Sequence, residues 1–315
     1  MIDVIVVGGG PAGLTAATYL HRFHRSCLVL DAGESRARWI PESNNCPGFP
    51  HGVSGKELLR RMREQAGEVG LVTERAVVDG IRPLDGGFEV TAGEHSWRAR
   101  KVILASGVSD RLPEGPWVAD AIARGALRLC SVCDAYEASD LVIGVHGPAD
   151  EVGGHALFLL GYSDTVRVLP SDGGDGGDGG DAGRRSREAG AEWLPGGGRL
   201  AFDGEKCSYV PLEGAPITLD TVYAYLGSDT SAGIAAAAGA ALTDEGEIIV
   251  DGDQQTRLPG LYAIGDVVSG LNQISVAVGH AAIAATHAHN ALPFAARRQA
   301  GKQKTPLARG FLSST

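Results

Sequence analysis

The N-terminal glycine turn constrains the fold more than any other feature of the sequence. An apolar, mostly β-branched run at residues 2–7 leads directly into Gly8-Gly9-Gly10-Pro11-Ala12-Gly13, and apolar residues then recur at helical spacing. A second apolar run at residues 27–30 ends at Asp31. The order of strand, tight turn, helix, strand and acidic residue predicts a βαβ unit with a dinucleotide site at the turn.

Each glycine of this turn has a separate task in such a site. Gly8 permits the tight turn, Gly10 lets the backbone approach a pyrophosphate, and Gly13 brings the helix close to the strand. The phosphate lies at the helix N-terminus because unpaired N–H groups and the positive end of the dipole point there. Asp31 then holds a ribose hydroxyl. An ordinary tight turn without a ligand is the alternative interpretation.

Composition excludes several classes of partner. The chain has 28 Lys and Arg against 38 Asp and Glu, a formal net charge of −10, which argues against nucleic acid or an anionic membrane as the main partner. No apolar run approaches the roughly 18 to 20 residues of a membrane span. The N-terminus has no basic leader and begins with a buried strand, so we expect a cytoplasmic location.

The cysteines indicate redox chemistry rather than a secreted disulfide framework. Five are present, and only Cys130 and Cys133 are spaced as a CxxC pair, directly followed by Asp134. Zinc would need two further ligands, which the surrounding sequence does not offer, so we predict no metal site. A strand before the pair and a helix after it would place the thiols at a helix start, which favours thiol-disulfide exchange. Two buried, reduced cysteines with Asp134 as a cap remain the alternative.

The C-terminal part adds a short apolar strand that ends in Gly265-Asp266, followed by Asn272-Gln273 and an apolar helix at about residues 274–291. Two shorter blocks, Asn45-Cys46-Pro47-Gly48-Phe49-Pro50 and Ala105-Ser106-Gly107, come before the cysteine pair. With the glycine turn and the CxxC-Asp block, the sequence resembles low-molecular-weight thioredoxin reductases. These are FAD flavoproteins of the pyridine-nucleotide-disulfide oxidoreductase superfamily, and the similarity runs over most of the chain.

This resemblance implies an α/β fold with two Rossmann-like, three-layer (ββα-type) nucleotide-binding domains, the second inserted in the first. The discontinuous FAD-binding domain is expected at residues 1–116 and 243–315. The insert, an NAD(P)H-binding-like domain that carries the cysteine pair, is expected at residues 117–242. Thioredoxin reductases are homodimers, so the resemblance also implies a homodimer.

The resemblance further assigns roles to single residues. Cys133 is the thiol that reacts with the flavin, Cys130 exchanges with the substrate, and Asp134 donates and accepts protons. Asn45 lies near the isoalloxazine, and Asp266 binds the ribityl chain. The helix after Gln273 points its N-terminus at the flavin edge where reduced flavin concentrates negative charge. The predicted FAD-binding residues are Gly8, Gly10, Pro11, Ala12, Gly13, Asp31, Asn45, Ser106, Gly107, Gly265, Asp266, Gln273 and Ile274.

The insert departs from the family where NADPH would bind. Strands at residues 141–145 and 165–169 and a helix at 151–160 predict that its fold is retained. Its turn, at residues 144–150, lacks G-x-G-x-x-G; Pro148 removes an N–H and Asp150 adds a negative charge. Four aspartates among the glycines of residues 171–181 stand where the family has a basic motif. We therefore expect poor or no NADPH use, and a solvated loop rather than a Ca²⁺ site.

Several electron partners and directions stay open on the sequence. The substrate is expected to be a thioredoxin-like protein or a small dithiol or disulfide, with ferredoxin or oxygen as further redox partners. Asp134 favours the reductase direction, because the dithiol oxidases we know tend to carry His after the second cysteine. An oxygen-dependent dithiol oxidase and a non-catalytic flavin redox sensor are the two alternatives. His280 is a weaker candidate for tuning the flavin, and Phe311 in the basic tail for covering it.

Overall fold

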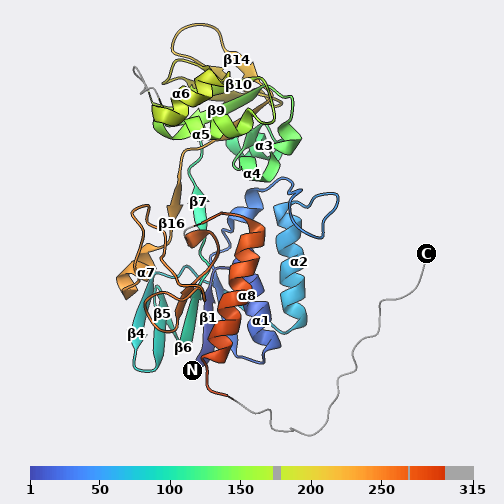
Figure 1. The fold of residues 1–315 in the computed structure, drawn as a ribbon. Coiled ribbons are helices and arrows are strands. Elements are labelled where there is room, and N and C mark those ends of the chain that lie inside the picture. Colours follow the sequence, from blue (N-terminus) through green and yellow to red (C-terminus); the bar gives the residue numbers. More distant parts are fainter. Residues whose placement is uncertain (173–178, 269, 295–315) are drawn as a thin grey trace, which may run out of the picture.

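The computed structural model describes residues 1–172, 179–268 and 270–294. It consists of two bodies joined by the antiparallel strand pair β7 (Val108–Asp110) and β16 (Ser228–Thr230) (Figure 1). The larger body holds both ends of the described chain, and the smaller one is made from its middle (Figure 1). Across the described residues, every helix is too short or too polar to cross a bilayer.

A twisted sheet forms the centre of the larger body. In the described part of the chain its strands are β1 (Ile2–Val7), β2 (Cys27–Asp31), β3 (Val72–Arg75), β4 (Gly80–Leu84), β5 (Gly87–Ala92), β6 (His95–Leu104) and β17 (Leu261–Ala263). Their order is β3-β2-β1-β6-β5-β4, with β17 also paired to β6. The pairings of β1, β2, β3, β6 and β17 are parallel, whereas β4, β5 and β6 form an antiparallel meander.

Burial on both faces explains why β1 has a continuous apolar sequence. Val4 and Val6 pack beneath the long helices α1 (Pro11–Arg22) and α8 (Ile274–Asn290), which lie side by side (Figure 1). Ile5 and Val7 point to the opposite face, where the β4–β5 meander and α7 (Gly233–Ala238) complete a second cluster. Strands covered on both sides read as apolar runs rather than alternating patterns. The larger body therefore has three layers.

Shorter elements complete the larger body next to the glycine turn. They are η1 (Arg36–Trp39), α2 (Gly55–Glu68) and η3 (Gly265–Val267). Helix α2 begins at a capping sequence, Ser54-x-x-Glu57, in which the Ser54 hydroxyl oxygen accepts a hydrogen bond from the Glu57 N–H at 3.2 Å. Pro11 occupies the first turn of α1, where its missing N–H leaves no helical hydrogen bond unmade.

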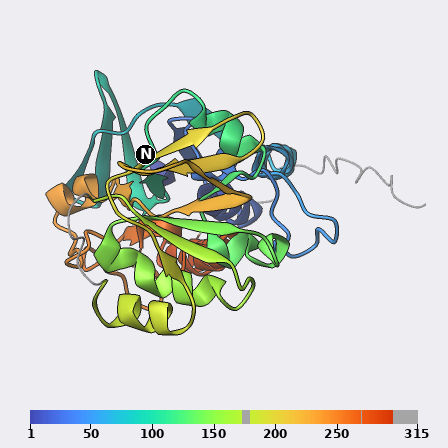
Figure 2. The same cartoon turned by 90° about the horizontal axis from the view of Figure 1, so that it is seen from above.

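The smaller body is also layered around a parallel sheet. Its helices are α3 (Val118–Ala123), α4 (Ser131–Asp134), η2 (Tyr136–Ala138), α5 (Ala149–Leu159) and α6 (Gly180–Glu188). Its parallel strands are β8 (Leu127–Arg128), β9 (Ile143–Gly147), β10 (Val166–Pro170), β11 (Glu192–Trp193) and β15 (Thr221–Ala224), in the order β11-β10-β9-β15-β8. Helices α5 and α6 lie on one side, and the antiparallel strands β12 (Arg199–Phe202), β13 (Cys207–Val210) and β14 (Ile217–Leu219) on the other (Figure 2).

The predicted elements of this body are present, with small shifts at their ends. The strand expected at 141–145 is β9 at Ile143–Gly147, the helix expected at 151–160 is α5, and the strand expected at 165–169 is β10. In both bodies a central sheet is covered on its two faces. This architecture confirms the predicted fold class, two Rossmann-like α/β units. Residues 173–178 of the Gly-Asp repeat and the basic tail with Phe311 lie outside the described residues.

Helix α7 bears on where the insert ends. The sequence places residues up to 242 in the insert, but Ala232, Ala235 and Ala240 pack in the core of the larger body with Ile81 and Ile248. The chain has therefore already returned through β16 before α7 begins (Figure 1). We propose that the insert spans the residues between β7 and β16, with its C-terminal boundary near residue 230 rather than 242.

Candidate active site

A cavity of about 700 Å³ lies where the two bodies meet. It brings together segments that are far apart in the sequence: the glycine turn, η1, residues 105–110, the start of α4 and residues 264–277. All predicted cofactor-binding and catalytic residues line this cavity except Gly13. Gly13 lies one layer deeper, where a Cβ atom would be 1.9 Å from the carbonyl oxygen of Gly8. It therefore serves helix–strand packing, the task expected from its place in the turn.

The geometry at the glycine turn leaves room for a ligand but not for side chains. Gly8 has φ +110°, and a Cβ there would lie 2.3 Å from the carbonyl oxygen of Ala105. Gly10 precedes α1 without any side-chain cap, so the first N–H groups of the helix face the cavity. The Oδ1 atom of Asp31 accepts hydrogen bonds from the N–H groups of Gly9 (3.1 Å) and Gly33 (3.0 Å). This fixes the carboxylate at the end of β2.

The remaining donors of the cavity fit a flavin dinucleotide. Helix α8 also begins without a side-chain cap, so two helix N-termini open into one cavity. Such ends attract anionic groups, here a pyrophosphate at α1 and a negatively charged ring edge at α8. The Oγ atom of Ser106 is buried and has no hydrogen-bond partner among the described residues. A ligand that carries polar groups along its length would satisfy these groups, as FAD does.

A disulfide joins Cys130 and Cys133 at the wall of this cavity. The Nε2 atom of Gln273 donates to both sulfur atoms, at 3.4 Å to Cys130 Sγ and 3.3 Å to Cys133 Sγ. The Oε1 atom of Gln273 in turn accepts from Asn45 Nδ2 at 3.0 Å. Gln273 of the larger body, predicted only as a flavin neighbour, thus contacts the disulfide of the smaller body, and Asn45 contacts Gln273. In this structure the pair is oxidised rather than reduced.

Asp134 is held by two residues that the sequence analysis did not identify. Arg128 Nη1 lies 2.9 Å from Asp134 Oδ2, and the Tyr223 hydroxyl donates to Oδ1 at 2.8 Å. Burial raises the pKa of Asp134, while Arg128 and Tyr223 oppose this rise. Arg128 stands in an otherwise apolar strand two residues before Cys130. A charged residue at that position was the signal that could have identified it.

A second group of charges, Arg36, Asp110 and Asp266, also lines this cavity, and of these only Asp266 was predicted. Arg36 binds both carboxylate oxygens of Asp110, at 2.7 Å from Nε and 2.8 Å from Nη2. Its Nη1 atom contacts Asp266 Oδ2 at 3.2 Å. Burial raises the pKa of Asp266, and Arg36 opposes that rise. Asp110 is the last residue of β7, one of the two strands that connect the bodies. Arg36 therefore links this connection to Asp266, which is expected to contact the ribityl chain.

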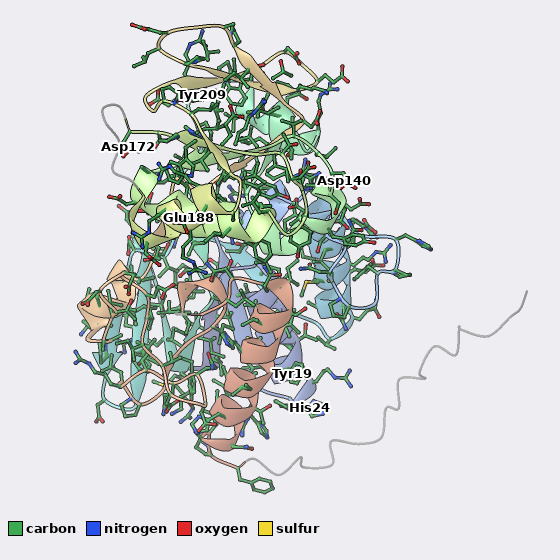
Figure 3. All side chains as sticks on the ribbon, turned by 45° about the horizontal axis from the view of Figure 1, so that its top comes forward. Tyr19, His24, Asp140, Asp172, Glu188 and Tyr209 are labelled. Atoms are coloured by element: carbon green, nitrogen blue, oxygen red, sulfur yellow. A yellow bond between two sulfur atoms is a disulfide. The ribbon has the colours of Figure 1, made fainter. Side chains whose placement is uncertain are left out.

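The turn between β9 and α5, where a second dinucleotide would bind, is occupied by the protein's own groups. The N–H of Ala149 at the start of α5 donates to Asp172 Oδ1 at 2.9 Å. Asp172 lies at the edge of the smaller body, on the loop that follows β10 (Figure 3). Nearby, the His155 ring stacks on Tyr225 with 3.5 Å between ring centroids. In α6, Arg184 forms an ion pair with Asp181.

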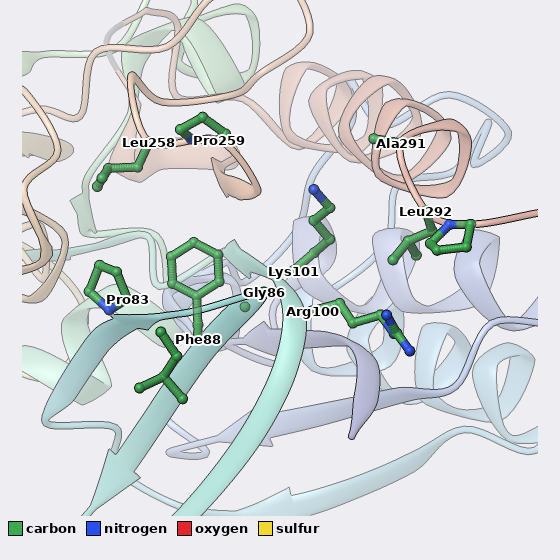
Figure 4. Close-up of a pocket in the computed structure, with 12 residues that line it drawn as sticks. Pro83, Gly86, Phe88, Arg100, Lys101, Leu258, Pro259, Ala291 and Leu292 are labelled. Carbon is green, nitrogen blue, oxygen red and sulfur yellow. The ribbon is translucent and has the colours of Figure 1, made fainter.

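One further predicted residue, His280, lies outside the lining of this cavity. Its Nδ1 atom is buried without a partner in the described chain, and burial lowers the pKa of His280. Its role in tuning the flavin therefore stays a prediction. A second cavity of about 390 Å³ lies between the β4–β5 turn and the C-terminal end of α8, lined by Phe88, Lys101, Leu258 and their neighbours (Figure 4). Its lining includes Gly86 and Gly87 of the β4–β5 hairpin but no cysteine.

Comparison with known proteins agrees with this site. Residues 2–144 and 186–281 match the family described as pyridine nucleotide-disulphide oxidoreductase. The chain is 29% identical to a thioredoxin reductase from Listeria innocua, over 91% of this chain and 92% of that protein. It is 35% identical to a bifunctional thioredoxin reductase/thioredoxin from Mycobacterium leprae, over 53% of this chain and 37% of that protein. The solved thioredoxin reductase from Streptococcus pyogenes is similar at a TM-score of 0.81 and 25% identity, covering 92% of this chain and 97% of that one. The chain belongs to the pyridine nucleotide-disulphide oxidoreductase family and is a thioredoxin reductase-like flavoprotein disulfide oxidoreductase.

Proposed function

We propose that this enzyme uses FAD to exchange electrons between the Cys130–Cys133 pair and a thioredoxin-like protein or small dithiol, with poor or no use of NADPH. One observation carries the proposal: the disulfide lines the same cavity as the glycine turn and is hydrogen-bonded by Gln273, at the start of α8. A disulfide placed beside a flavin cavity is suited to passing two electrons across it.

The residues that would hold FAD are those that line the cavity. The α1 N-terminus with Gly8 and Gly10 would hold the pyrophosphate, Asp31 the adenosine ribose, and Asp266 the ribityl chain. Bound FAD supplies an acceptor and donor of two electrons. The uncapped N-terminus of α8 favours negative charge at the ring edge. These assignments follow the family resemblance, and the free donors of the cavity support them.

Exchange with a dithiol needs only the cysteine pair and a proton carrier. One substrate sulfur bonds to Cys130 Sγ as the Cys130–Cys133 bond breaks, and the second substrate sulfur then displaces Cys130. The substrate becomes a disulfide, and its two electrons and two protons pass to the enzyme pair. The reverse sequence reduces a substrate disulfide. Asp134, directly after Cys133, is placed to accept or return one of these protons.

Weak NADPH use is supported by the groups that already occupy the insert turn. A phosphate at the α5 N-terminus would have to displace the Asp172 carboxylate from the Ala149 N–H. Asp150 in the first turn of α5 adds a further negative charge, and Pro148 offers no N–H. Phosphate binding at a helix start depends on free donors and positive potential, and Asp172, Asp150 and Pro148 reduce both at this turn.

The thiol partner and the assembly are inferred from relatives. Proteins of similar sequence are named thioredoxin reductases, and one carries thioredoxin in the same chain. We infer a thioredoxin-like partner, a homodimer and a cytoplasmic location. Ferredoxin or oxygen would then replace NADPH as the redox partner. The occupied insert turn favours the oxygen-dependent dithiol oxidase as a second candidate function, because such an enzyme needs no nicotinamide.

Anaerobic flavin reduction separates these functions. The holoenzyme is mixed in parallel with NADPH, NADH and dithiothreitol, flavin absorbance is followed, and oxygen is then admitted. We expect dithiothreitol to bleach the flavin and both nucleotides to act at least about a hundredfold more slowly. A Cys133→Ser variant serves as control and should not respond to the dithiol. Rapid bleaching by micromolar NADPH would refute weak nucleotide use, and equal responses of both proteins to dithiol would refute a redox role of the pair. Repeated turnover with oxygen would identify the oxidase.

A further inference from the structure

The carboxylate of Asp134 is fixed on both oxygens by side chains of the insert sheet. Arg128, in β8, contacts Oδ2 through Nη1, and Tyr223, in β15, donates its hydroxyl to Oδ1. The guanidinium is itself held, because its Nε donates to Thr221 Oγ1 at 3.1 Å and its Nη1 lies 3.4 Å from the Asp134 carbonyl oxygen. Tyr223 is fully buried, and the side chains of Arg128 and Asp134 are only 17% and 18% exposed.

These contacts act on the protonation state of Asp134. An arginine and a hydroxyl donor both stabilise the ionised carboxylate, whereas burial stabilises the protonated form. The other titratable groups near Asp134 are Glu137 in η2 and Tyr225 after β15. Glu137 adds negative charge and so favours the protonated form as well. Of these neighbours, only Arg128 and Tyr223 keep the carboxylate ionised.

We propose that Arg128 and Tyr223 are positioning residues that hold Asp134 as an ionised proton acceptor beside the redox cysteines. The inference rests on the proposed thiol-disulfide exchange. When the reduced pair attacks a substrate disulfide, the attacking thiol gives its proton to Asp134, the new enzyme–substrate S–S bond forms and the substrate S–S bond breaks. The departing thiolate then takes the proton from Asp134. The acceptor must be ionised at the start of this step.

The same contacts also tie the short helix α4 to the sheet, so the test needs a readout that a purely structural tie would not move. That readout is the pH dependence of exchange. Loss of one charge-assisted hydrogen bond raises the pKa of a carboxyl by about one unit. The acid limb of the pH profile should therefore move upward in a variant that lacks the Tyr223 hydroxyl, while the rate at high pH stays close to the wild-type value.

The experiment uses holoenzyme reduced with dithiothreitol, desalted anaerobically and mixed with 2,2′-dithiodipyridine, a neutral disulfide. Neutrality of the probe prevents a change of protein charge from altering its attraction. For Tyr223→Phe we expect the acid limb to shift upward by about one pH unit. On the acid side of this limb, exchange should be about tenfold slower than in the wild type. Arg128→Met should shift the limb further, and Arg128→Lys should recover part of the shift, because the lysine charge lacks the arginine geometry.

Tyr209→Phe is the matched control. Tyr209 is another fully buried tyrosine of the insert, and its hydroxyl donates to the Pro195 carbonyl oxygen at 2.6 Å, away from the cavity. The Tyr209→Phe protein should be less stable than the wild type, but the pH profile of its exchange rate should be unchanged. If Tyr223→Phe and Tyr209→Phe had identical pH profiles and normal exchange, the role of Tyr223 would be refuted, but the proposed function would stand. Absence of exchange in the reduced wild-type enzyme would overturn the proposed function instead.

Discussion

Removal of the Arg36 guanidinium should destabilise the protein and weaken FAD binding together. The side chain of Arg36 is 25% exposed and lies between the carboxylates of Asp110 and Asp266, which are 14% and 20% exposed. In Arg36→Met the methionine preserves part of the apolar stem. The variant leaves the Asp110 and Asp266 carboxylates without the Arg36 cation in a partly buried site. Each carboxylate thereby loses an ion pair and a hydrogen bond.

The expected magnitude follows from this burial. Breaking a fully buried pair by removing one partner costs about 3–5 kcal/mol, whereas an exposed pair contributes less than about 1 kcal/mol. Because the three side chains are partly exposed, we expect the free energy of unfolding to fall by about 2–3 kcal/mol at neutral pH. The dissociation constant of FAD should rise about tenfold, since Asp266 loses the group that orients it.

The destabilisation should also depend on pH. Burial raises the pKa of Asp266 and Arg36 opposes the rise, so the folded variant has a still higher Asp266 pKa. The folded state then binds a proton more readily than the unfolded chain, and stability increases as the pH falls through that window. The loss is therefore largest at neutral pH and above and becomes smaller as the solution is acidified toward the raised pKa.

Urea unfolding at several pH values and FAD titration into the apoprotein measure both effects. Arg38→Met is the matched control, because Arg38 pairs with Glu34 at the surface, where the side chains are 37% and 66% exposed. Its effect should stay within about 0.5 kcal/mol. Equal losses for the two variants, or a loss in Arg36→Met that does not change with pH, would show that the buried charge cluster does not carry the stability assigned to it.

Three further substitutions test other parts of the argument. Gly13→Ala would bring a Cβ to 1.9 Å from the Gly8 carbonyl oxygen, so the purified protein should contain little flavin by absorbance, whereas Gly67→Ala, in open space, should be neutral or stabilise by about 0.5 kcal/mol. Ser54→Ala should lower the free energy of unfolding by about 1 kcal/mol through loss of the α2 cap, and Ser54→Asp should retain it. Asp172→Ala frees the Ala149 N–H, and NADPH-driven flavin reduction should become about tenfold faster in stopped-flow measurements; an unchanged rate would mean that Asp172 is not what limits nucleotide binding.

Local patterns were sufficient to predict much of the fold. Strand β1, helix α1 and Asp31 are encoded by a continuous apolar run, a glycine turn and an acidic strand end, all within one βαβ unit. Helix α8 follows from its length and apolar character. The cavity could be anticipated because the glycine turn and the Gly265 block both occur at strand ends of one sheet, which bring their residues to the same edge.

Contacts between distant segments could not be predicted in the same way. Gln273 reaches the disulfide only because the smaller body lies against the start of α8, and no sequence pattern fixes that orientation. Arg36 stands 74 residues from Asp110 in the chain, and Tyr223 stands 89 residues from Asp134. Ion pairs and hydrogen bonds of this kind depend on how distant elements are arranged in the folded protein. On our proposed boundary the alanine-rich helix α7 belongs to the larger body instead of the insert, and its sequence fits either core.

The two βαβ turns of this chain show what the fold alone requires. Both consist of a strand, a turn and a helix, but the first helix begins at a cavity, whereas at the start of the second helix the Ala149 N–H donates to Asp172. The smaller body keeps its core through Val145, Val152 and Val168, none of which needs a nucleotide. A body whose core is stable without a ligand can lack a working nucleotide site and still hold the disulfide at the flavin cavity. On the proposed function, the position of the cysteine pair explains why the insert fold is retained, and the fold by itself gives no argument for NADPH as the electron source.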